Sequence, residues 1–207
     1  MQEIIKQLVL SLFSNPTLAT IFISMFPVIE IKGAIPFGQN TQIWGVDALS
    51  PIASLLCALL GGLIVSTLLL TLLKLTFRLL NFKQKYKSVV DKIKATFSSK
   101  IKKIEKENRF KTYLYLFLFV AIPLPLTGTW TAALAAAILN LDFFKSLLVI
   151  NLGNVVAGII IYLISTLSPS LSIYIFYFFA ACLILTVVFY SIKIIITNLK
   201  ENKKAWL

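Results

Sequence analysis

The stretch FPVIEIKGAIPFGQ, residues 26–39, places two opposite charges inside an apolar run. Glu30 and Lys32 are two residues apart, and Pro27 and Pro36 lie on either side of them. Residues at positions i and i+2 of a helix point to different sides and do not face each other. Either the backbone at these residues is not helical, or each charge has a separate partner. The stretch therefore predicts an interruption of regular helix at a charged site.

The composition around this stretch is typical of a membrane protein. Of 207 residues, 58% are hydrophobic and the mean hydropathy is +0.90, which is more apolar surface than a soluble domain of this length needs. Three uncharged runs at 51–73, 146–170 and 171–192 contain 23, 25 and 22 residues. About 20 apolar residues cross a bilayer core of about 30 Å as a helix. We therefore expect an all-α integral membrane protein with several spans.

The basic residues gather on one side of the predicted spans. Residues 74–111 contain thirteen Lys or Arg and three acids, and the C-terminal tail is also basic. Loops rich in Lys and Arg stay on the cytoplasmic side, so both segments are expected there, in the cell (inner) membrane. Within the loop, residues 88–111 have one apolar face and are expected to lie on anionic lipid headgroups. The predicted partner of this +12 chain is thus the lipid bilayer, not nucleic acid.

Residues 112–141 are too few to cross the bilayer twice. Two limbs of ten and eleven residues, 112–121 and 131–141, would each be only about 15 Å long as helix. Pro123, Pro125 and Gly128 break the helix between them. We expect a re-entrant hairpin that enters from the cytoplasmic side and reverses near the midplane.

The same order of elements occurs twice. Residues 17–26 and 39–49 predict a second hairpin that enters from outside, with the opening stretch at its apex. Each hairpin precedes a span with a similar motif, LGGLIV at 60–65 and LGNVVA at 152–157. Two copies of opposite topology form an inverted repeat, the architecture of many secondary transporters.

The predicted fold is therefore a multi-span helical protein with two facing re-entrant hairpins in an inverted repeat, plus a C-terminal transmembrane helix. A single membrane domain would cover residues 1–207. Its parts are repeat one with an interfacial helix (1–73), the basic cytoplasmic segment (74–111), repeat two (112–164) and the last span (171–197).

Charges at membrane depth mark the candidate site, because an intramembrane ionisable residue usually indicates an ion pathway, a proton relay or a substrate contact. The chain has no histidine, so a carboxylate is the natural proton carrier, and Glu30 is the best placed. Lys32 would bind an anion. Two other interpretations stay open: the pair only locks the hairpin tips together, or both charges lie at the outer interface.

The second apex, PLPLTGTWTAALAAA, offers complementary chemistry. Thr127 or Thr129 can cap a half-helix whose free N–H groups would form an anion or phosphate site, although a tight turn without ligand fits the segment equally well. Trp130 is a cavity wall or an anchor, and Asn151 and Asn154 line a pathway or join helices. The residues predicted for the substrate or ion pathway are Glu30, Lys32, Gly33, Pro36, Pro123, Pro125, Thr127, Gly128, Trp130 and Asn154.

The segments EIKGAIPFG and PLPLTGTWTAAL resemble the two signatures of the small multidrug export family, E-L-R-G-A-I-P and P-L-P-G-T-G-A-W-T-G. Lys32 stands for the motif Arg, and Leu126 for the first motif Gly. The family is in turn distantly similar to the DedA and VTT membrane proteins, which share facing re-entrant hairpins and move lipids, including polyprenyl phosphates. The resemblance implies export or lipid movement.

The sequence favours a small secondary transporter, proton- or ion-coupled, with an unidentified small-molecule or lipid substrate. The alternatives are a DedA-like flippase or scramblase for a phosphate-bearing lipid, and a non-transporting membrane assembly protein. An enzyme is not favoured, since no nucleophile–base pair or phosphate loop stands out. Cys57 and Cys182 sit in apolar runs without histidine partners, so no metal site or cofactor is expected. A homodimer stays open.

Overall fold

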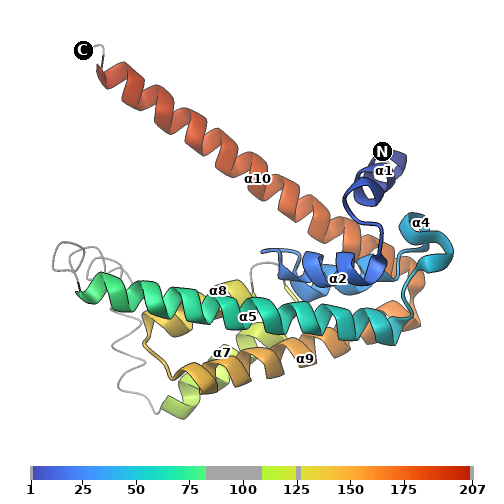
Figure 1. Ribbon diagram of the computed structural model, residues 1–207, viewed down its shortest axis with the longest axis horizontal. Coiled ribbons are helices and arrows are strands. Elements are labelled where there is room, and N and C mark those ends of the chain that lie inside the picture. Colours follow the sequence, from blue (N-terminus) through green and yellow to red (C-terminus); the bar gives the residue numbers. More distant parts are fainter. Residues whose placement is uncertain (1, 83–108, 125–126, 206–207) are drawn as a thin grey trace.

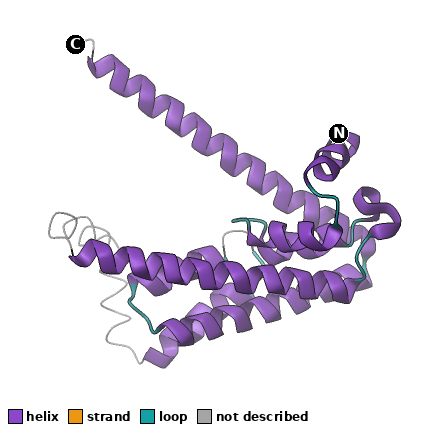
Figure 2. Ribbon diagram, viewed as in Figure 1, coloured by secondary structure: helices purple, strands orange, loops and turns teal. Residues whose placement is uncertain are grey.

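The computed structural model describes residues 2–82, 109–124 and 127–205. Within these ranges all regular secondary structure is helical (Figure 2). The helices are α1 (Gln2–Leu12), α2 (Pro16–Met25), α3 (Glu30–Gly38), α4 (Thr41–Trp44), the 3₁₀ turn η1 (Gly45–Asp47), α5 (Pro51–Phe82), α7 (Arg109–Ala121), α8 (Thr129–Ile138), α9 (Phe143–Leu167) and α10 (Pro169–Ala205).

Three of these helices are long and apolar enough to cross a bilayer, as the uncharged runs predicted. Their qualifying segments are Pro51–Leu79, Phe143–Leu167 and Tyr174–Ile194. Large apolar side chains remain exposed along α5, α9 and α10, which is the expected outer surface of helices solvated by lipid tails. The prediction of an all-helical membrane protein is confirmed at this level.

Two pairs of short helices pack on the long ones. The limbs α2, α3 and α8 have ten, nine and ten residues, and α7 has thirteen. At 1.5 Å per residue none of them reaches across a core of about 30 Å. Both α3 and α8 contact α5 as well as α9, so the two long helices hold the two short pairs together (Figure 1).

The first pair differs from the predicted hairpin in its return limb. We predicted that the chain reverses within 26–39 and returns through 39–49, but α3 already is the return limb and the reversal occupies 26–29. Pro36 lies inside α3 and does not end it. A proline removes only one helical hydrogen bond, and burial of all nine residues of α3 supports this short helix. Residues 41–47 form α4 and η1 instead of a limb.

Glycine seats the first limb of each pair on the following long helix. A Cβ at Gly61 in α5 would lie 2.3 Å from the backbone oxygen of Ile21 in α2. A Cβ at Gly153 in α9 would lie 2.9 Å from the backbone oxygen of Phe117 in α7. These glycines belong to the LGGLIV and LGNVVA motifs. In each half of the chain the motif glycine therefore lies against the backbone of the first short helix.

The last helix α10 is held at its beginning. Phe176 and Phe179 are buried where α10 contacts α3 and α9, whereas Ile184, Leu185 and Phe189 are all exposed. Beyond these contacts α10 leaves the rest of the helices (Figure 1). The beginning of α10 is therefore the part that belongs to the packed body.

Gly61→Ala should destabilise the protein by about 1–3 kcal/mol, because its Cβ meets the α2 backbone, which cannot move aside cheaply. The neighbouring Gly62→Ala is the matched control. Its Cβ would meet only side chains, at 3.1 Å from Ile31 Cγ2 and 3.4 Å from Asn154 Nδ2, and better helix propensity offsets the contact. Thermal unfolding in detergent measures both variants, and equal losses would contradict this packing.

Candidate functional site

The backbone at the first reversal is left-handed at two residues that are not glycine. Val28 has φ +75° and Glu30 has φ +47°. Each such residue costs about 1–3 kcal/mol and persists only where its surroundings hold it. Because Glu30 departs from helical geometry, its side chain can reach the residue two positions later. Both possibilities raised by the i, i+2 spacing are found, because the backbone at Glu30 is left-handed and each charge also has a partner outside the pair.

Glu30 and Lys32 form an ion pair in the interior. Lys32 Nζ lies 3.3 Å from Glu30 Oε2, and the two residues are only 1% and 6% exposed. Burial of an isolated charge costs several kcal/mol, and removal of one partner from a buried pair is strongly destabilising. Each charge therefore requires the other in this arrangement.

Lys32 also bridges the two helix pairs. Its Nζ donates to the backbone oxygen of Leu124 at 2.9 Å and to the backbone oxygen of Thr127. Both acceptors lie in the break between α7 and α8, more than ninety residues along the chain. A lysine ammonium has three N–H donors, and these two carbonyls plus the Glu30 carboxylate provide three acceptors.

The Glu30 carboxylate lies at the N-terminus of α8. Its Oε1 accepts a hydrogen bond from the backbone N–H of Trp130 at 3.4 Å, and the N–H of Thr129 also faces it. A negative charge at this end of a helix is favourable, because the first N–H groups have no helical partner. The anion that meets the half-helix in this structure is thus supplied by the protein itself.

Gly128 makes room for this contact. It occupies the N-cap position of α8 with φ 179°, an extended conformation open to any residue. A Cβ at this position would lie 1.7 Å from Glu30 Oε2. The glycine is required for space and not for its backbone conformation.

The two threonines serve other roles than the predicted caps. Thr127 Oγ1 donates within its own loop, to the backbone oxygens of Ile122 and Leu124. Thr129 Oγ1 exchanges hydrogen bonds with the Asn154 amide, at 3.0 and 3.2 Å, so Asn154 joins α9 to the start of α8. The expectation that Thr127 or Thr129 caps the half-helix is wrong, because Gly128 holds that position and Glu30 fills the space a capping side chain would need.

The remaining predicted residues lie around this centre. Trp130 Nε1 donates to the backbone oxygen of Met25 at 3.0 Å, which ties α8 to the end of α2. A Cβ at Gly33 would lie 3.2 Å from Phe179 Cβ, so α10 approaches α3 closely there. Pro36 is buried within α3, and Pro123 lines a cleft. Pro125 lies outside the described residues, as does most of the predicted lipid-binding helix 88–111.

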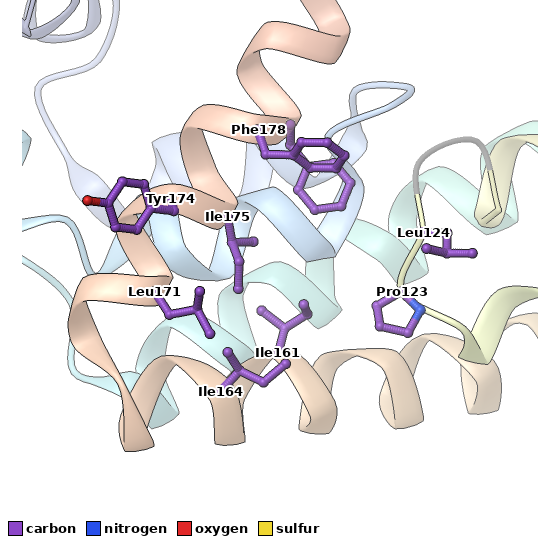
Figure 3. Close-up of a pocket in the computed structure, with 9 residues that line it drawn as sticks. Pro123, Leu124, Ile161, Ile164, Leu171, Tyr174, Ile175 and Phe178 are labelled. Atoms are coloured by element: carbon purple, nitrogen blue, oxygen red, sulfur yellow. The ribbon is translucent and has the colours of Figure 1, made fainter.

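An apolar cleft of about 370 Å³, drawn in Figure 3, includes Leu124, whose backbone oxygen accepts a hydrogen bond from Lys32. Its walls come from α9, from the beginning of α10 and from the chain after α7. They consist of Pro123, Leu124, Ile161, Ile164, Leu171, Tyr174, Ile175, Phe178 and Phe179. Sequence reasoning missed every one of these except Pro123. In the sequence these residues can be recognised only as apolar, and residues that face lipid are apolar as well.

The groups at the site are suited to charge recognition. In the described ranges no three His, Cys, Asp or Glu side chains come together to hold a metal ion. What the residues do provide is one carboxylate, one ammonium, two backbone carbonyls from the break between α7 and α8, and a helix N-terminus, all within the contact between the two helix pairs.

A family model described as "Putative small multi-drug export protein" matches residues 30–160. The match begins at Glu30 and includes the second break, α5 and most of α9. The chain belongs to this family. No curated protein and no solved structure matches it. Membership in the small multidrug export family, together with the three apolar helices, indicates a membrane protein.

Gly128→Ala should destabilise the protein by about 3 kcal/mol, since its Cβ would push the carboxylate away from Lys32 and α8. In a Glu30→Ala background the same substitution should cost less than about 1 kcal/mol, because the group it collides with is gone. Unfolding free energies of the four proteins provide the comparison. Equal costs in both backgrounds would show that Gly128 does not serve the carboxylate.

Proposed function

We propose that this member of the small multidrug export family is a secondary transporter whose path runs between the tips of α2–α3 and α7–α8. The observation that carries the proposal is the buried Glu30–Lys32 pair, whose ammonium also binds the backbone of the opposite tip. A charged group at the contact of two broken helices is costly. Such groups usually mark an ion pathway, a proton relay or a substrate contact.

The two helix pairs act as facing re-entrant hairpins in an inverted repeat. This part of the proposal rests on limb length, because helices of nine to thirteen residues cannot span the core. It also rests on the equivalent packing of Gly61 against α2 and of Gly153 against α7. Irregular backbone at membrane depth survives where protein shelters it, and each tip shelters the other.

Proton coupling follows from the chemistry of the pair. With Glu30 ionised, the ammonium has three acceptors and the tips stay joined. A proton on Glu30 removes the negative charge that contacts both the Trp130 N–H at the start of α8 and the Lys32 ammonium. The contact between the tips is then weaker, so the tips can separate. One proton then accompanies each opening, and Glu30 is the carrier.

The orientation of the transporter follows from its basic segments. Residues 74–111 and the C-terminal tail face the cytoplasm of a cell whose inner membrane holds the protein. Residues 88–111 lie on anionic headgroups of the same leaflet. Cargo passes outward across this membrane.

Proton flux into proteoliposomes under a pH gradient tests the proposal. Wild type should acidify the lumen, and Glu30→Gln, which keeps the size of the side chain but cannot titrate, should abolish the flux. Asp47→Asn is the matched control, because Asp47 is an exposed acid in η1, and it should leave the flux unchanged. Flux through Glu30→Gln equal to wild type would reduce the pair to a structural contact.

The apolar cleft favours a second candidate, a flippase or scramblase for a phosphate-bearing lipid. The cleft is open and lined almost entirely by hydrocarbon, so an acyl chain could lie in it while the headgroup meets Lys32. If Glu30 were fully paired and no cavity lay nearby, a non-transporting assembly protein would be favoured. The cleft that includes Leu124 supports a path for cargo instead. Movement of a fluorescent phospholipid between leaflets, without a pH gradient, would distinguish lipid transport from coupled export.

A further inference from the structure

The surroundings of the Lys32 ammonium are those of a cation site. Three oxygens face it: Glu30 Oε2 and the backbone oxygens of Leu124 and Thr127. A carboxylate together with carbonyls of interrupted helix is a set of ligands used for cations in secondary transporters. The three oxygens surround a primary ammonium group, and that group belongs to the chain itself.

Lys32 can leave this position more easily than Glu30 can. The carboxylate is fixed by the left-handed backbone of Glu30, by the Trp130 N–H and by the close approach of Gly128. The ammonium stands at the end of a flexible four-carbon stem, which can swing without moving the backbone. When it swings out, the buried Glu30 carboxylate is left without a positive partner, and either a proton on Glu30 or a cation at the three oxygens restores the charge balance.

The apolar cleft adjoins the three oxygens. Leu124 belongs to both, since its backbone oxygen accepts from Lys32 and its side chain lines the cleft. On the other side Phe179 lines the cleft and approaches Gly33, the residue after Lys32. A volume of about 370 Å³ is within the range of small-molecule sites. A ligand that spans both places would have a charged head and an apolar body.

We propose that Glu30, Leu124 and Thr127 bind the ammonium of a protonated amine, and that the cleft holds the amine's apolar body. Lys32 occupies the head position in this structure and gives way to the cargo. The inference rests on the proposed function, because it names the cargo class of the same path. It excludes anionic cargo at this position, since the place of an anion beside α8 is filled by Glu30.

Chemical rescue of Lys32→Ala tests the site. The variant, in nanodiscs, should melt below wild type, and alkylammonium ions should raise its melting temperature by about 5 °C when present at about 100 times their dissociation constant. Hexylammonium should act at lower concentration than methylammonium, because its chain reaches the cleft. Wild type should respond only at higher amine concentrations than Lys32→Ala, since its own ammonium competes for the site. Glu30→Gln/Lys32→Ala should not respond, since the charge that attracts the amine is gone.

The other outcomes overturn the proposal. No response of Lys32→Ala to any amine, or an equal response of Glu30→Gln/Lys32→Ala, would show that the oxygens bind no amine. A response to NaCl alone would assign a metal-cation site instead. If Lys32→Ala cannot be purified, Lys32→Met keeps the stem volume and receives the same series. Melting is measured without flux, so loss of rescue and loss of transport are separate results.

Discussion

The contact of the Lys32 ammonium with three oxygens is the interaction on which the rest of the structure depends. It places a full charge in the interior, and the cost of that burial is several kcal/mol unless every donor is satisfied. One acceptor comes from Glu30 and two come from the break between α7 and α8. Both breaks in the short helices are therefore parts of one arrangement, in which each supplies what the other lacks.

The residues around this contact have strained backbone or unusually close packing. Val28 and Glu30 adopt left-handed backbone, position 128 has no side chain, and Asn154 crosses from α9 to hold Thr129. Close packing at Gly61 holds α2 in place, and close packing at Gly153 holds α7 in place, next to this strained backbone. A site that is strained and held by rigid neighbours is suited to switching between two states, since a small change in charge alters which state is favoured.

Part of this could be predicted from the sequence. The three long helices follow from uncharged run lengths, and both interruptions follow from prolines and glycines, which lie beside charges only in the first interruption. The return limb was misplaced because Pro36 suggested a break, whereas tertiary burial keeps α3 helical. The role of Gly128 depends on a carboxylate about a hundred residues away, and no local pattern reports that. The cleft could not be predicted, because the sequence does not distinguish Ile161 or Phe178 from apolar residues that face lipid.

The coupling free energy between positions 30 and 32 tests the central claim most directly. Unfolding is measured for wild type, Glu30→Gln, Lys32→Met and the double variant under identical conditions. Each single variant leaves one buried group without its partner, so the account predicts a loss of about 3–5 kcal/mol in each. The double variant should lose clearly less than the sum, with a coupling of at least about 2 kcal/mol. Additive losses would contradict the account, because the two charges would then be independent and the tips would be held by other contacts.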